Sequence, residues 1–201
     1  MGTMRLCRGD LFSVTPVNSV AIAHGCNICG VMGGGIAYDV KRIFPDMYEE
    51  YHQLCKNHKI GAGDIFTSVQ QLNGRPITVY NLMSQTGLNG ADIKFMAMAF
   101  ERMFEHANKN GIETIYIPMI GAGLGGISPS VCFNVYLETV EQFKGRLNVI
   151  VQFVENVKPH VIKDDTNDPR NVYKRAKEIA EREALAKQVS GTVTDSNNTN
   201  K

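Results

Sequence analysis

The sequence lacks the features that mark a membrane protein or a general nucleic-acid binder. Its 21 Lys and Arg residues nearly balance 20 Asp and Glu residues, which leaves a formal net charge of +1. Such a chain has no broad electrostatic footprint for nucleic acid or a membrane surface. Apolar runs such as residues 149–154 are far shorter than the roughly 20 residues of a membrane-spanning helix, and no basic segment precedes an apolar leader. We therefore expect a cytoplasmic protein that has no membrane partner and binds any anion locally.

Disulfides and a structural metal are also poorly supported. Five cysteines are an odd number, and without an export signal they are expected to be reduced thiols. Cys26 and Cys29 form a C-x-x-C, but no second pair follows at the spacing of a zinc site, so small residues lining a turn are the favoured interpretation. The Gly-Lys-Ser/Thr of a nucleotide-binding P-loop is absent as well. We expect neither a metal nor a cofactor.

The hydrophobic pattern predicts one α/β domain. At 201 residues and 43% hydrophobic content, the chain can bury one substantial core. Asn73-Gly74 between two strand patterns indicates a hairpin, so part of the sheet is antiparallel. Alternating strands and helices then predict a three-layer α/β/α sandwich with a mixed central sheet. Strands are expected at residues 5–7, 20–24, 64–70, 77–82, 114–118 and 148–153, and helices at 36–44, 45–56, 93–108 and 129–143.

The composition changes after this domain, which we place at residues 4–154. Residues 155–189 read as a polar linker followed by a charged helix, and residues 190–201 have no core-forming side chains and are predicted to be disordered. A short nucleic-acid contact through Lys174, Arg175 and Lys177 stays open, although a large interface is disfavoured by the balanced charge. The expected oligomeric state is a monomer.

Two glycine-rich segments carry the strongest functional signal. Residues 30–35 follow one predicted strand and open a helix, and residues 121–126 follow another strand before the Ser128-Pro129 start of a helix. Glycine lets backbone N–H groups approach a ligand closely, and a helix N-terminus adds partial positive charge. Neither segment has the dinucleotide-binding spacing, since the second lacks a following acidic ribose-binding residue. Together they favour a diphosphate ligand over ordinary turns.

Three motifs then resemble a known family. They are Gly9-Asp10-Leu11-Phe12, the string from His24 to Tyr38 that reads HGCNICGVMGGGIAY, and the string from Pro118 to Ile127 that reads PMIGAGLGGI. In order and spacing they resemble the macrodomain family, which binds ADP-ribose, over roughly residues 4–154. Within it, the chain looks most like fungal ADP-ribose 1″-phosphate phosphatase. A branch of glycohydrolases that remove ADP-ribose from proteins or DNA is related too.

The resemblance implies a role for each matching residue. Asp10 would accept a hydrogen bond from the adenine amino group, Leu11 would frame that pocket, and Asn27 would face the distal ribose. Phe153 could flank adenine, with core packing about equally favoured. The two glycine segments would hold opposite sides of the diphosphate. The implied binding residues are Asp10, Leu11, Gly33, Gly34, Gly35, Ile36, Ala37, Ile120, Gly121, Ala122, Gly123, Leu124, Gly125 and Gly126.

His24 and Asn27 are the predicted catalytic residues. His24 matches the position of a catalytic histidine that the resemblance implies, and a histidine can exchange protons near pH 7; the alternative is a hydrogen-bonded histidine at a strand end. The resemblance implies that the glycohydrolase branch uses a lysine just after the strand at residues 77–82, where this chain reads Met-Ser-Gln85-Thr. It also implies an acid in the second glycine segment of some members, where this chain has Gly125. An amide nitrogen cannot replace that lysine as a nucleophile.

The predicted function is therefore hydrolysis of ADP-ribose 1″-phosphate to ADP-ribose and phosphate. A second catalytic acid is not identifiable from the sequence; Asp92 is a candidate, but a helix N-cap is its favoured role. Two alternatives stay open. One is a binding module for ADP-ribose or a related NAD-derived nucleotide without turnover. The other is a lysine-free glycohydrolase acting on modified protein or DNA.

Overall fold

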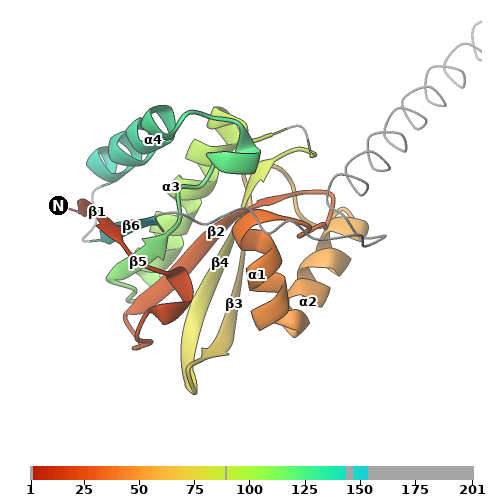
Figure 1. The fold of residues 1–201 in the computed structure, drawn as a ribbon, viewed down its shortest axis with the longest axis horizontal. Coiled ribbons are helices and arrows are strands. Elements are labelled where there is room, and N and C mark those ends of the chain that lie inside the picture. The colour runs from red at the N-terminus through yellow and green to blue at the C-terminus, as the bar shows by residue number, and fades with distance from the viewer. Residues whose placement is uncertain (1, 89, 144–146, 154–201) are drawn as a thin grey trace, which may run out of the picture. The chain divides into compact units, whose positions relative to one another are not determined.

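A six-stranded sheet organises residues 2–88, 90–143 and 147–153, the part of the chain that the computed structural model describes. The strands lie in the order β1-β6-β5-β2-β4-β3 (Figure 1), and only β3 runs antiparallel to its neighbour, so the predicted mixed sheet is confirmed. Their bounds are β1 Thr3–Arg8, β2 Val20–Asn27, β3 Ile65–Leu72, β4 Arg75–Gln85, β5 Thr114–Ile117 and β6 Asn148–Phe153.

The hairpin between β3 and β4 forms at the predicted dipeptide. Asn73 and Gly74 have φ angles of 51° and 75°. Two consecutive residues with positive φ make a type I′ turn, whose twist matches that of the flanking strands. Leu72 consequently pairs with Arg75 across the turn, and the register continues without a bulge to Ile65 and Leu82.

Two layers of helices cover the sheet, as predicted. Helices α1 (Gly35–Ile43) and α2 (Pro45–Lys56) lie on one face, and α3 (Ile93–Lys109) and α4 (Pro129–Gln142) lie on the other. The side chains of a strand point alternately to opposite faces, so Ala21 and Ala23 of β2 join the α3/α4 core while Ile22 joins the α1/α2 core. The short helices η1 (Leu11–Ser13) and η2 (Gly123–Gly125) complete the described elements.

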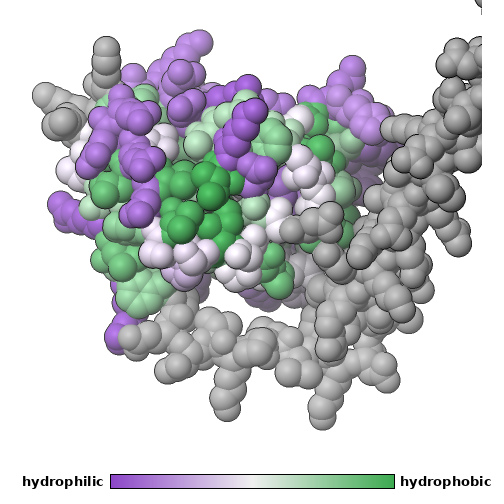
Figure 2. All heavy atoms as spheres, turned by 90° about the horizontal axis from the view of Figure 1, so that it is seen from above, coloured by the Kyte–Doolittle hydropathy of each residue, from purple (hydrophilic) through white to green (hydrophobic). Residues whose placement is uncertain are grey.

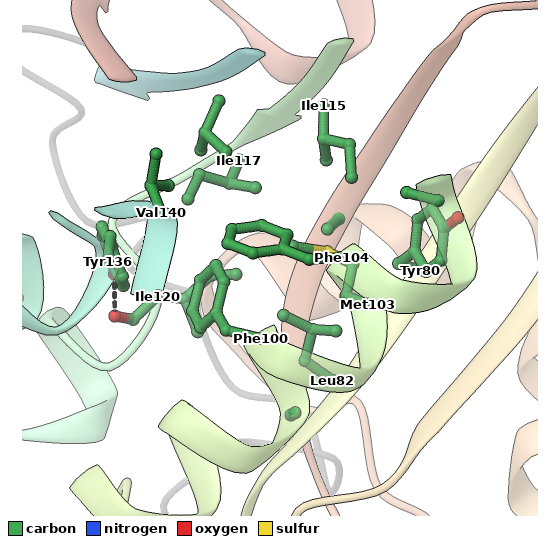
Figure 3. Close-up of a cluster of buried hydrophobic side chains, with 14 of the residues drawn as sticks. Tyr80, Leu82, Phe100, Met103, Phe104, Ile115, Ile117, Ile120, Tyr136 and Val140 are labelled. Carbon is green, nitrogen blue, oxygen red and sulfur yellow. Dashed lines mark hydrogen bonds between the residues drawn. The ribbon is translucent and has the colours of Figure 1, made fainter. Parts of the chain in front are cut away.

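The α3/α4 core is built on aromatic and branched side chains. Figure 3 shows Phe100 and Phe104 of α3 between Ile115 and Ile117 of β5 and Tyr136 of α4. The rings of Phe100 and Tyr136 have their centroids 4.8 Å apart. Met96 and Met103 of α3 are buried in the same core, where the flexible methionine side chain fills irregular space.

Both predicted helix caps form. The Asp92 carboxylate accepts a hydrogen bond from the Lys94 backbone N–H at 2.8 Å, so Asp92 is the N-cap of α3. Ser128 caps α4, whose first residue is Pro129. Among the described residues, no helix is long and apolar enough to cross a membrane. The predictions for residues 155–189 and 190–201 lie outside the described part of the chain.

Candidate functional site

The parallel strands bring four predicted site segments to one edge of the sheet. Strands β1, β6, β5 and β2 are successive parallel neighbours, so their carboxyl ends line up. Asp10 follows β1 directly, and the Gly9 N–H donates to the Phe153 carbonyl at the end of β6 at 3.1 Å. The second glycine segment follows β5, and Asn27 ends β2. This edge is where open α/β sheets bind their ligands.

The first glycine segment ends in an uncapped helix N-terminus. Gly34 is the N-cap of α1 and has no side chain to accept from the first turn. The Tyr38 N–H is the first to bond back, to the Gly34 carbonyl at 3.4 Å. The N–H groups of Gly35, Ile36 and Ala37 therefore lack intrahelical partners, and the helix dipole favours negative charge beside them. This geometry suits a phosphate.

Close packing fixes the second glycine segment. Gly121 has φ of 90°, and a Cβ there would lie 2.6 Å from Met96 Sδ and 3.0 Å from Cys132 Sγ. The N–H groups of Gly125 and Gly126 close the turn onto carbonyls of the same segment. Those of Gly123 and Leu124 have no hydrogen-bond partner within the described ranges. Two backbone donors are thus left for a ligand.

The two glycine segments face one another. Leu124 is 75% exposed, and its Cδ1 lies 3.7 Å from the position that a Cβ on Gly35 would occupy. Figure 2, which views the molecule from above relative to Figure 1, shows apolar side chains gathered near the middle of that face with hydrophilic ones above them. Gly35 also has φ of 57°, which side chains other than hydrogen rarely allow, so the backbone at this position favours glycine.

The tertiary structure also joins the two positions at which the chain departs from the glycohydrolase pattern. Gln85 ends β4, next to Asn27 in the register of β2 and β4. The Gly125 carbonyl accepts a hydrogen bond from the Ala91 N–H at 2.8 Å, and a Cβ on Gly125 would lie 3.9 Å from Gln85 Nε2. Gln85 and Gly125, forty positions apart in the sequence, therefore lie close together. At this place the protein has an amide side chain and a residue without a side chain.

Asn27 uses its polar atoms to shape the segment that follows it. Its Oδ1 accepts from the backbone N–H groups of Cys29 at 2.9 Å and Val31 at 3.3 Å, while Nδ2 donates to the Val31 carbonyl at 2.7 Å. Tyr51 of α2 donates its hydroxyl to the Asn27 carbonyl at 2.7 Å. Tyr51 was not identified from the sequence; its spacing of four from Met47 and Cys55 on a helix is the signal that it points inward, but that spacing does not name its partner.

His24 lies in the protein interior rather than on the surface. It is 0% exposed, and its Nε2 lies 2.7 Å from Asn81 Oδ1. Asn81 Nδ2 donates to the Phe66 carbonyl, so Oδ1 faces the imidazole and Nε2 carries the proton. Burial lowers the pKa of His24 to about 4, against partial opposition from its hydrogen bonds to Asn81 and the Gly25 backbone. The ring is therefore neutral at pH 7.

The other predicted binding residues differ in exposure. Asp10 is exposed and accepts from the Phe12 N–H at 3.1 Å, so it also caps η1. Leu11 is buried in the α1/α2 core and Ile120 in the α3/α4 core. All five cysteines are free, and Cys26 is buried whereas Cys29 is exposed. Within the described ranges, no cluster of His, Cys, Asp and Glu has the geometry to hold a metal ion.

Comparison with known proteins agrees with this geometry. The sequence pattern of the macro domain matches residues 23–136, which is more than half of the chain. The chain belongs to the macro domain family. The macrodomain of Thermus aquaticus DarG superposes with a TM-score of 0.65 at 26% identity, covering 76% of this chain and 99% of that one.

Curated relatives of this macrodomain carry two different enzyme names. A DNA ADP-ribosyl glycohydrolase of Thermus aquaticus is 28% identical over 175 residues, which are 86% of this chain and 48% of that protein. An ADP-ribose 1″-phosphate phosphatase of Debaryomyces hansenii is 35% identical over 105 residues, which are 50% of this chain and 55% of that protein. This chain thus spans about half the length of both relatives.

Proposed function

We propose that this macrodomain binds an ADP-ribose-type ligand in an extended pose and removes the phosphate of ADP-ribose 1″-phosphate. Adenine would lie beside Asp10 and Phe153, at the β1 and β6 ends. The diphosphate would lie between the two glycine segments, where the N–H groups at the start of α1 lack intrahelical partners and those of Gly123 and Leu124 have no partner among the described residues. The distal ribose would then reach Asn27 and Gln85, at the β2 and β4 ends.

The observation that carries the choice of reaction is the contact between Gln85 and Gly125. A lysine-dependent glycohydrolase needs a basic nucleophile here, and the amide of Gln85 has no lone pair available for attack on the ribose carbon. Gly125 supplies no carboxylate, and a Cβ there would already lie 3.1 Å from the Ala91 Cβ. An uncharged amide suits a terminal phosphate, which it can bind by donating hydrogen bonds.

The buried position of His24 favours a second candidate, an ADP-ribose-binding module without turnover. A general base must lie within hydrogen-bond reach of the proton that it removes, directly or through one water. His24 is fully buried, faces Asn81, and has its pKa lowered to about 4. Its geometry suits a positioning residue that holds the end of β2 in place.

One set of assays separates these functions. The full chain is incubated in parallel with ADP-ribose 1″-phosphate, ADP-ribosylated protein and ADP-ribosylated DNA, while ADP-ribose binding is measured by calorimetry. Phosphate release from the first substrate alone supports the phosphatase. Binding without release supports the binding module, and loss of ADP-ribose from protein or DNA would overturn the argument from Gln85 and Gly125.

A His24→Gln variant tests the role of His24 within the same assays. Its amide can still donate to Asn81, so the strand end should keep its structure. If His24 transfers a proton, turnover should fall by about 100-fold or more while KM stays near the wild-type value. If His24 only positions β2, both constants should change by less than about tenfold.

A further inference from the structure

Strand β3 is an edge strand without the usual protection against pairing. It contacts β4 on one side, and no other described strand lies beside it. Edge strands are commonly blunted by charge, proline or a bulge, because their free N–H and C=O groups can pair with another chain. The opposite edge, β1, carries Arg5 and Arg8. Ile65–Leu72 contains no charged residue and no proline, and its register with β4 is unbroken.

The hairpin determines which backbone groups of β3 point outward. In a two-residue type I′ turn, the residues that flank the turn, Leu72 and Arg75, form a hydrogen-bonded pair. Hydrogen-bonded and non-bonded pairs alternate along an antiparallel ladder. The N–H and C=O groups of Thr67, Val69 and Gln71 are consequently turned away from β4. These groups are the ones that a further strand would meet.

The side chains of β3 are complementary to themselves about Val69. Val69 is 68% exposed, although it is apolar and lies near the middle of the strand. The two residues at equal sequence distance before and after Val69 are either both polar or both apolar. The mirrored pairs are Ser68 with Gln70, Thr67 with Gln71, and Phe66 with Leu72.

We propose that two copies of the chain pair antiparallel through β3, about a two-fold axis at Val69. Val69 packs against Val69 of the partner subunit, which removes exposed apolar surface from water. Thr67 lies opposite Gln71 of the partner subunit, so hydroxyl meets amide and no like charges face each other. The two sheets become one, and the glycine segments take no part. This dimer replaces the monomer expected from the sequence.

The mass of the full chain in solution tests the proposal. Light scattering and sedimentation velocity from about 1 to about 100 µM should show the 22.2 kDa chain change to a species of twice that mass. Val69→Lys places two ammonium groups at the axis, so its dissociation constant should rise by at least about tenfold. Leu6→Lys is the matched control, because Leu6 is 52% exposed on the opposite edge strand; it should dimerise like the wild type.

Amide exchange keeps the test decisive if Val69→Lys does not fold. In the wild type, the Val69 and Gln71 amides should exchange at least about tenfold more slowly at the highest concentration than at the lowest. A wild-type chain that stays single at about 100 µM overturns the proposal. So does a dimer whose Val69 and Gln71 amides gain no protection, or one that is weakened equally by Leu6→Lys.

Discussion

Lowering the pH should weaken the fold through one buried histidine. His24 has its pKa lowered from 6.5 to about 4 by burial, whereas the unfolded chain restores the ordinary value. Between these two values the unfolded state binds a proton that the folded state does not. The free energy of unfolding therefore falls as the pH falls from 6.5 to about 4, and the contribution of neutral His24 is fully present above pH 6.5.

The size of the effect follows from the same two values. Each pKa unit corresponds to about 1.4 kcal/mol, so the whole difference is worth about 3 kcal/mol. Most of it falls in an accessible range: from pH 7 to about pH 5 the wild type should lose about 2 kcal/mol through His24 alone. That is a large fraction of the roughly 5–15 kcal/mol that stabilises an ordinary domain.

Urea unfolding at several pH values measures this loss. His24→Gln keeps a donor for Asn81 but does not titrate, so its unfolding free energy should depend on pH less steeply than the wild type's. His58→Asn is the control, because His58 is exposed and asparagine tolerates its φ of 52°. Equal pH slopes in the wild type and His24→Gln would refute the reasoning, as would an NMR titration of His24 near pH 6.5.

Four further substitutions test the site. Gly121→Ala adds a methyl 2.6 Å from Met96 Sδ at a φ of 90°, so it should lower the free energy of unfolding by roughly 3 kcal/mol and abolish ADP-ribose binding. Gly126→Ala is its control: with φ of 75° and open space around it, it should lower the free energy of unfolding by only about 1 kcal/mol. Chemical unfolding and calorimetry measure both, and equal costs would contradict the packing argument. Tyr51→Phe leaves the Asn27 carbonyl without its 2.7 Å donor and should cost about 1–3 kcal/mol in urea unfolding; no change would mean that the bond does not support the segment. Leu124→Ala should change stability by less than about 0.5 kcal/mol but weaken ADP-ribose binding about tenfold by calorimetry, and unchanged affinity would place Leu124 outside the site.

The sequence by itself determined the elements and their layers. Runs rich in Val, Ile and aromatic residues located the six strands of the described residues, and a 3.6-residue period located their four long helices, since that period records which side chains face a core. Asn73-Gly74 predicted the hairpin, because only residues that tolerate positive φ fit its turn. The glycine strings identified the family, because their backbone conformation and close approach leave little freedom in sequence.

Only the tertiary structure decided what surrounds each functional side chain. The string around His24 looks like one continuous site, but successive strand residues point to opposite faces, and His24 packs beside Asn81 in the α1/α2 interior. Asn27 and Tyr51 meet because helix α2 packs on β2, a contact that no local pattern encodes. Strand β2 separates β4 from β5, so Gln85 and Gly125 adjoin only because the segment that follows β5 extends past β2 to Ala91, whose N–H donates to the Gly125 carbonyl. Local periodicity fixes the direction of a side chain, whereas its neighbours, its burial and its pKa depend on long-range packing between strands and helices.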